Sequence, residues 1–275
     1  MRAIGIHLVQ DARREHAPAR STVVEVAPGA GIAGVQMCRT DSEVIDAVGP
    51  GPALVLVDAP LATPEVAGRR DPEHVLAWLD IPAFPVTPGR MRTVHGGARG
   101  VELAQTLTAC GHVVAEAIPD QILRQIMWEA DHPPGAPALD LATYRAEWLG
   151  VRPPAFRPRG GRAHHDGLTP ARTLVQSVAA CEAWPVSERG GDLAALDEAS
   201  VIDAATCALL AHRCLHGAGD RWAMIGTQQA GRIALAACPE MIDRATVNID
   251  RMVQQGMIFI PRGVAGSDVG PPQSW

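Results

Sequence analysis

The stretch ALVLVDAPL, residues 53–61, decides the fold that the sequence predicts. Up to its single charged residue, Asp58, it is apolar at every position, which is typical of a central strand covered on both faces. The runs AIGIHLV (3–9) and HVVAEAIP (112–119) have the same character. Strands that are covered on both faces belong to a sheet with helices on each side.

The segments around these runs extend the predicted sheet. Residues 21–28 and 31–38 are two apolar runs that meet at the turn sequence PGAG, which indicates a hairpin. Helices are expected at 42–49, 98–110, 119–130 and 197–215, and later strands at 222–237 and 257–261. We therefore predict an α/β protein with a mixed sheet, three antiparallel strands followed by parallel ones, and helices on both faces.

The length suits one large domain. We expect a single domain over residues 1–260, with insertions at about 62–97 and 131–196 and a flexible tail at 261–275. Both insertions are rich in proline and glycine, which interrupt regular structure. They are therefore predicted to be mostly loop, with a short helix near PEHVLAWL and helical structure after residue 172.

Composition excludes several classes of function. All 24 basic residues are arginine, so a P-loop and a Schiff-base lysine are both excluded. The net charge of −6 argues against a surface that is cationic throughout.

No apolar run approaches the roughly 20 residues of a membrane helix, and charged residues follow the first strand at once. The six cysteines include no C-x-x-C pair, which fits reduced thiols, so we expect a cytoplasmic protein without a membrane partner.

Four elements that look buried each contain one isolated polar side chain. These side chains are His7, Asp58, Glu116 and Asp203, and Asp203 is the only charge in the apolar helical segment VIDAATCALLA. A buried carboxylate without a partner costs several kcal/mol, and a divalent cation such as Mg²⁺ or Mn²⁺ offsets that cost. Ligands of open α/β sheets gather beyond the carboxyl ends of the strands. We therefore expect all four side chains to converge at one end of the sheet.

Each of these residues also has a structural explanation. His7 fits a core histidine with one hydrogen bond, and Asp58 fits a turn residue before Pro60. Glu116 fits the partner of an arginine, and Asp203 fits a position near a helix start. The occurrence of all four together favours a site.

The same segments resemble a known family. AIGIHLV, LVLVDAPL with the downstream GRRD, VVAEAIP and VIDAATCALLA resemble, in order and spacing, family 429 of the domains of unknown function, described as predicted nucleases with a ribonuclease H-like fold. The resemblance covers most of residues 3–237 and agrees with the order of strands and helices derived above. It implies an acidic cluster that holds two metal ions, which activate a water and stabilise the leaving oxygen of a phosphodiester.

The first strand departs from the family pattern. The pattern there is Gly-Ile-Asp, whereas this chain has Gly5-Ile6-His7. His7 therefore stands where the resemblance implies the first metal-binding aspartate. Imidazole ligates Mn²⁺ or Zn²⁺ but favours Mg²⁺ poorly, and the substitution removes one negative charge. A modified or lost nuclease activity is therefore one expectation.

Two arginine-rich segments are candidates for contacts with substrate. One lies between Arg145 and Arg172, where planar guanidinium groups suit phosphate. The other, GRMRTVHGGARG at 89–100, precedes a helix whose N-terminal amides could bind phosphate. Either segment could equally be a solvated loop without a ligand. The predicted substrate-binding residues are Arg157, Arg159, Arg162, Arg90 and Arg92.

The function that these residues predict is a metal-dependent phosphodiesterase or nuclease, a hydrolase acting on nucleic acid. His7, Asp58, Glu116 and Asp203 would be both the catalytic residues and the ligands of Mn²⁺ or Mg²⁺. The alternative is a catalytically inactive ribonuclease H-like module that binds nucleic acid or a protein partner. The sequence leaves open whether the substrate is DNA or RNA, and it leaves the oligomeric state open.

Overall fold

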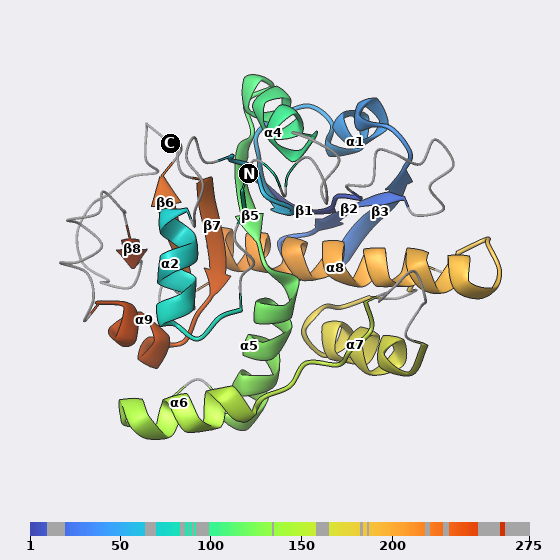
Figure 1. Cartoon of the computed structure of the whole chain (residues 1–275). Coiled ribbons are helices and arrows are strands. Elements are labelled where there is room, and N and C mark those ends of the chain that lie inside the picture. The colour runs from blue at the N-terminus through green and yellow to red at the C-terminus, as the bar shows by residue number, and fades with distance from the viewer. Residues whose placement is uncertain are drawn as a thin grey trace.

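The protein is built around one mixed β-sheet with helices on both faces (Figure 1). The computed structural model describes residues 1–9, 20–63, 70–82, 86–87, 89, 91, 99–133, 135–157, 165–181, 184–185, 187–217, 221–227, 231–246 and 259–261. The α/β architecture predicted from the apolar runs is confirmed, including helices on each side of the sheet.

The described part of the sheet contains eight strands in the spatial order β3-β2-β1-β4-β5-β7-β6-β8. β1, β2 and β3 are antiparallel neighbours, as predicted, whereas β4 is parallel to both β1 and β5, and β5 is parallel to β7. β4 is the central strand that its apolar sequence predicts. The strands are β1 (Arg2–His7), β2 (Ser21–Val26), β3 (Ile32–Cys38), β4 (Ala53–Asp58), β5 (Val113–Ala117), β6 (Trp222–Thr227), β7 (Gly231–Ala236) and β8 (Phe259–Pro261).

The helices divide between the two faces of the sheet. α8 runs along one face with α5 and α7 beside it, and α1, α4 and α2 cover the other face (Figure 1). Within the described ranges, no helix has the length and apolar character needed to span a bilayer. The helices are α1 (Asp41–Val48), α2 (Asp71–Trp78), α4 (Arg99–Ala109), α5 (Pro119–Asp131), α6 (Leu141–Gly150), α7 (His165–Val178), α8 (Gly191–His216) and α9 (Pro239–Thr246).

Helix α8 lies unusually close to strand β1, at Gly5. A Cβ atom built on Gly5 would lie 2.0 Å from the carbonyl oxygen of Ala204 and 2.2 Å from the amide nitrogen of Ala208. Only a glycine on the strand, facing small residues on the helix, permits this approach. The contact fixes the height of α8 above the sheet, and with it the position of Asp203, one residue before Ala204.

Two predictions about the chain's elements are corrected by the structure. Residues 222–237 are not one strand but the antiparallel pair β6 and β7. The insertion at 131–196 is not mostly loop, because it contains α6 and α7 as well as the start of α8. Helix α6 begins at a side-chain cap, Asp140, and buries Tyr144 and Trp148 against Trp128 of α5. The predicted tail falls, from residue 262 onward, outside the described residues.

Candidate metal centre

His7 and Asp58 end two adjacent parallel strands. They are the last residues of β1 and β4 and stand opposite each other in the register of the two strands. Side chains at paired positions point to the same face, so both face α8. His7 Nδ1 lies 3.0 Å from Asp58 Oδ2, and the two side chains are 22% and 25% exposed. The cluster is therefore open to solvent on one side.

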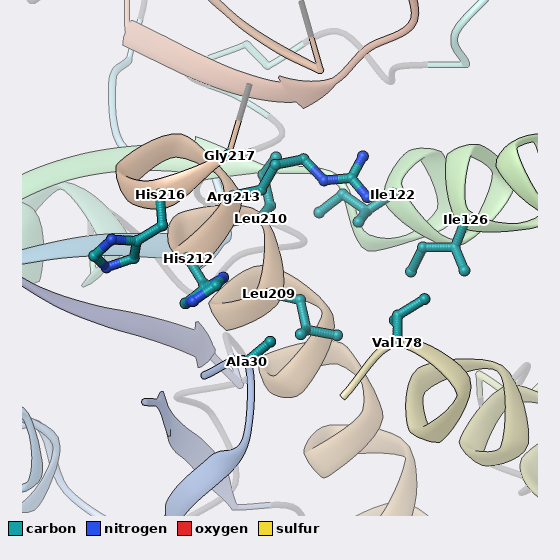
Figure 2. A pocket seen from close by; sticks show the side chains of 10 residues that line it. All are labelled: Ala30, Ile122, Ile126, Val178, Leu209, Leu210, His212, Arg213, His216 and Gly217. Atoms are coloured by element: carbon teal, nitrogen blue, oxygen red, sulfur yellow. The ribbon is translucent and has the colours of Figure 1, made fainter. Parts of the chain in front are cut away.

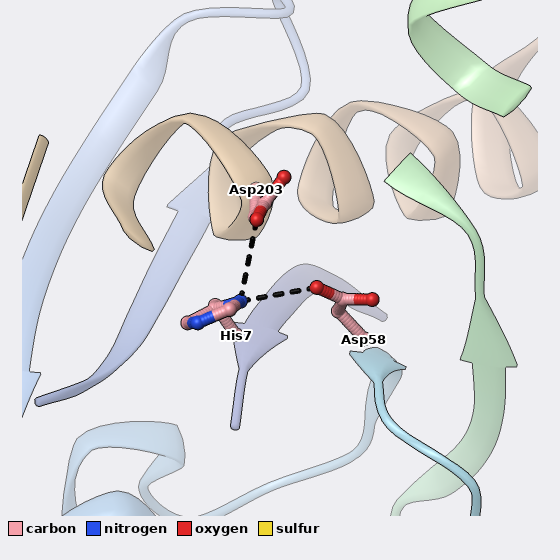
Figure 3. A group of neighbouring side chains, drawn as sticks. All are labelled: His7, Asp58 and Asp203. Carbon is pink, nitrogen blue, oxygen red and sulfur yellow. Dashed lines mark hydrogen bonds and ion pairs between the residues drawn. The ribbon is translucent and has the colours of Figure 1, made fainter. Parts of the chain in front are cut away.

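Asp203 reaches the same place from helix α8. Its Oδ2 atom lies 3.5 Å from His7 Nδ1, and its side chain is only 1% exposed (Figure 3). One ligand atom from each of His7, Asp58 and Asp203 can be chosen so that all three lie within 4.8 Å of one another. The structure thus brings together three of the four predicted site residues, and we call this group the His-Asp-Asp cluster.

The donor set of the cluster fits a divalent cation. It offers one imidazole nitrogen and two carboxylate oxygens, a combination suited to Mn²⁺ and similar ions. Two ligands at right angles around one ion, each about 2.1 Å away, are about 3 Å apart. The distances from His7 Nδ1 to Asp58 and Asp203, 3.0 and 3.5 Å, are close to that separation. The spacing of these atoms is therefore compatible with one ion.

Arg157 neutralises the buried carboxylate of the cluster. Its Nε lies 2.9 Å from Asp203 Oδ2 and its Nη2 lies 2.6 Å from Asp203 Oδ1, a two-point contact, and its Nη1 pairs with Asp120. We predicted that Arg157 would bind substrate. In this structure its guanidinium is instead engaged by two carboxylates, and it orients Asp203 toward His7.

The cluster shifts the pKa of each of its members. Burial alone would lower the pKa of His7, but the hydrogen bond to Asp58 and the charges of Asp203 and Asp58 outweigh it, so the pKa of His7 is raised. Burial alone would raise the pKa of Asp58, yet His7 and Arg157 hold it below its ordinary value. Burial raises the pKa of Asp203, helped by the charge of Asp58. A proton on His7 Nδ1 therefore competes directly with a metal ion for that nitrogen.

Glu116 does not belong to this cluster, which corrects our prediction that all four residues converge. In the register of β4 and β5 it stands beside Val57, not beside Asp58. Because side chains alternate along a strand, Glu116 points to the opposite face of the sheet. There it forms a buried ion pair with Arg70, whose Nη2 lies 2.8 Å from Glu116 Oε2. The structural explanation considered for Glu116, pairing with an arginine, is the one that the structure supports.

Arg70 links this ion pair to the start of α2. Its Nε donates to Glu73 Oε1 at 2.8 Å, and Glu116 Oε1 also accepts a hydrogen bond from the Leu61 amide at 2.9 Å. The sequence signal for Arg70 was present in the GRRD segment after β4, but its role as the partner of Glu116 was missed. The network fixes the chain where it leaves β4.

Replacing Glu116 by glutamine is expected to lower the free energy of unfolding by about 3 kcal/mol, because Arg70 stays buried beside a side chain without charge. Urea unfolding measures this loss, and calorimetric titration with Mn²⁺ should show unchanged affinity. The control is Glu25→Gln, which removes an ion pair with Arg2 that is about one-third exposed and should contribute less than about 1 kcal/mol. Unchanged stability together with a large loss of Mn²⁺ affinity would instead show that Glu116 is one of the metal ligands.

Some described arginines of the arginine-rich segments are paired with carboxylates. Arg145 pairs with Asp80 at 2.7 Å, and Arg172 pairs with Glu198 at 2.9 Å. Among the described arginines of the span from Arg145 to Arg172, carboxylates therefore engage three: Arg145, Arg157 and Arg172. Four of the predicted substrate-binding residues lie outside the described residues: Arg90, Arg92, Arg159 and Arg162.

A separate hollow of about 220 Å³ lies at the C-terminal end of α8 (Figure 2). Apolar side chains of α5, α7 and α8 face one another around it, among them Ile126, Val178 and Leu209, and His212 and His216 lie at its border. His212 already has a partner, the carbonyl oxygen of Pro28 at 2.8 Å. No member of the His-Asp-Asp cluster lines this hollow.

Comparisons with known proteins give limited information. No family model matches the chain, and no solved structure matches it. The chain is similar to the acetyl-coenzyme A carboxylase carboxyl transferase subunit alpha of Trichormus variabilis and of a Nostoc species, with 28% identity to each over 137 residues. The aligned part is 46% of this chain and 41% of each relative, so the match spans less than half of the relatives' length. A likeness of this extent does not place the chain in a family.

Proposed function

We propose that the protein is a metal-dependent phosphodiesterase that acts on nucleic acid and has a ribonuclease H-like fold, related to family 429 of the domains of unknown function. The observation that carries the proposal is the convergence of His7, Asp58 and Asp203, three metal-ligand side chains that approach from β1, β4 and α8. The ends of adjacent parallel strands are where open α/β sheets bind ligands. Three antiparallel strands followed by parallel β4 and β5, with a long helix across them, also agree with that fold.

Each side chain has a defined task in this proposal. A divalent ion held here would act as a Lewis acid on a phosphodiester oxygen and lower the pKa of a water. His7 offers its Nδ1 nitrogen, which must first lose its proton, and Asp58 offers an oxygen on the exposed side. Arg157 holds Asp203 by both oxygens and so fixes the buried ligand. Binding therefore strengthens as the pH rises through the raised pKa of His7.

Charge decides which metal the site prefers. With Glu116 on the other face, the cluster holds two carboxylates and one neutral imidazole, and Arg157 already offsets one of the two negative charges. Mg²⁺ prefers oxygen ligands, whereas Mn²⁺ accepts imidazole readily. The proposed enzyme is therefore a Mn²⁺-dependent one.

The test is cleavage of labelled single- and double-stranded DNA and RNA by wild type and by His7→Asp, with each metal. Wild type is expected to cleave faster with Mn²⁺ than with Mg²⁺, and His7→Asp is expected to gain Mg²⁺-supported cleavage because a third carboxylate enters the site. The control is His74→Asp, which makes the same chemical change at an exposed position of α2. Absence of cleavage with either metal in both proteins, together with no Mn²⁺ binding by calorimetry, would rule out the enzyme.

One observation favours a second candidate, a module that binds nucleic acid without cleaving it. Arg157 already compensates the buried charge of Asp203, so the cluster does not require a cation to be stable. In that case no cleavage would occur with either metal, binding of nucleic acid would be the same with and without a divalent ion, and Asp58→Asn would leave that binding unchanged. The assays above separate the two candidates.

A further inference from the structure

A second hollow, of about 190 Å³, lies at the start of α5. Residues from four segments line it: Ile81 and Pro82, which follow α2; the start of α5, including Asp120 and Arg124; Trp148 of α6; and residues 153–155, which follow α6. Asp120 connects the hollow to the cluster, because Arg157 pairs with both Asp120 and Asp203. The hollow and the metal centre are therefore joined by two consecutive ion pairs.

Arg124 lines this hollow and contacts an aromatic ring. Its guanidinium carbon lies 5.5 Å from the centre of the Trp148 ring, a cation–π contact that holds the side chain along the wall of the hollow. Among the described residues, no hydrogen bond or ion pair joins Arg124 to a carboxylate. Arg145, Arg157 and Arg172, by contrast, each pair with a carboxylate.

A second arginine adds to this local positive charge. Burial lowers the pKa of Arg124, and the charge of Arg152 lowers it further, whereas the charge of Asp120 acts in the opposite direction. Arg152 is exposed and directly precedes the two prolines that line the hollow. The N-terminal turn of α5 contributes further partial positive charge there, and the one carboxylate in the lining, Asp120, is already neutralised by Arg157. The local positive charge therefore favours binding of an anion.

We propose that Arg124 and Arg152 form a subsite for a backbone phosphate of a nucleic-acid strand, one position away from the phosphodiester held at the His-Asp-Asp cluster. The inference rests on the proposed function for its choice of ligand. A guanidinium matches phosphate oxygens in two-point contacts, and the hollow is large enough for a phosphate with part of its sugar. Arg124 was not among the residues that the sequence predicted, because it reads as an ordinary position of an amphipathic helix.

The experiment measures binding of fluorescein-labelled single-stranded DNA and RNA 12-mers by fluorescence anisotropy, in EDTA and without divalent ions. Arg124→Gln and Arg152→Gln are each expected to weaken binding at least fivefold. Each should also reduce the slope of log K against log salt by about 0.7, the value for one lost phosphate contact on a single strand. Arg145→Gln is the matched control, since it removes the same charge from a guanidinium paired with Asp80, and it should bind within twofold of wild type.

Three outcomes would overturn the subsite. If both variants bind like Arg145→Gln, Arg124 and Arg152 do not contact the strand. Because Arg152 is exposed, its replacement should not disturb folding, so the Arg152→Gln result stands even if Arg124→Gln folds poorly. If inorganic phosphate displaces the oligonucleotide at a similar concentration, the ligand is a free anion and not a strand. If both variants cleave oligonucleotides with an unchanged KM, the phosphate lies elsewhere.

Failure of the subsite and failure of the proposed function give different results. Hydrolysis of a small chromogenic phosphodiester with Mn²⁺ reports the metal centre alone, because such a substrate does not extend into the hollow. Loss of strand binding in Arg124→Gln with no hydrolysis by wild type supports the subsite and rejects the enzyme. Hydrolysis by wild type together with unimpaired strand binding in Arg124→Gln supports the enzyme and rejects the subsite.

Discussion

A Gly5→Ala variant is expected to lose at least about 3 kcal/mol of unfolding free energy, at the upper end of what one added methyl group causes in a packed core. The new Cβ would lie 2.0 Å from the Ala204 carbonyl oxygen, so helix α8 must move away from β1. Backbone atoms cannot rotate aside as a flexible side chain does. Urea unfolding followed by circular dichroism measures the loss.

The matched control is Gly34→Ala in β3, where an added Cβ meets no atom within 4 Å. This variant should be as stable as wild type or slightly more stable, because alanine restricts the unfolded chain. Since α8 also positions Asp203, Gly5→Ala should weaken Mn²⁺ binding in whatever fraction remains folded. Equal stability of Gly5→Ala and Gly34→Ala would show that α8 does not rest on the β1 backbone.

An Asp58→Asn variant is expected to lose at least about 100-fold in Mn²⁺ affinity, and Mn²⁺-supported cleavage should fall at least as far. Mutation of a residue that only hydrogen-bonds to a metal ligand typically lowers metal affinity 10- to 100-fold, and Asp58 would itself be a ligand. Asparagine keeps the shape of the side chain but removes its negative charge. Calorimetry and the oligonucleotide cleavage assay measure the two quantities.

The control for Asp58→Asn is Asp46→Asn, which makes the same change on the exposed side of α1 and should leave both quantities unchanged. Because the side chain of Asp58 is about one-quarter exposed, the variant should fold. Wild-type affinity in Asp58→Asn would remove the metal centre from the proposal and favour the binding module.

The apolar runs were sufficient to predict the centre of the fold. β1, β4 and β5 are buried on both faces. Such strands have a continuous apolar sequence, which can be recognised without knowing which helices and strands pack against them. The same reasoning placed Asp58 at the end of its strand, where the structure has it, whereas His7, which the sequence put in the middle of a strand, is the last residue of β1. For these elements local sequence and global fold agree.

The face to which Glu116 points could not be predicted in this way. It depends on whether Glu116 stands beside Val57 or beside Asp58, a shift of one residue in strand register that reverses every side chain. The partner of Asp203 was equally hidden, because Arg157 is 46 residues away in the sequence. Helix α6 was missed because its proline- and glycine-rich surroundings suggested loop, while its stability comes from burial of Tyr144 and Trp148.

The direct contact of α8 with the backbone of β1 also makes the proposed metal centre suitable for exchanging one ligand residue for another. No layer of side chains lies between helix and strand at Gly5, so the separation of His7 from residue 203 is set by two backbones. Repacking elsewhere in the core would leave that separation unchanged. Variants such as His7→Asp or Asp203→His would therefore sample different donor atoms at a nearly constant spacing. The donor atoms of the proposed metal centre can thus be varied while the backbone geometry around them is held fixed.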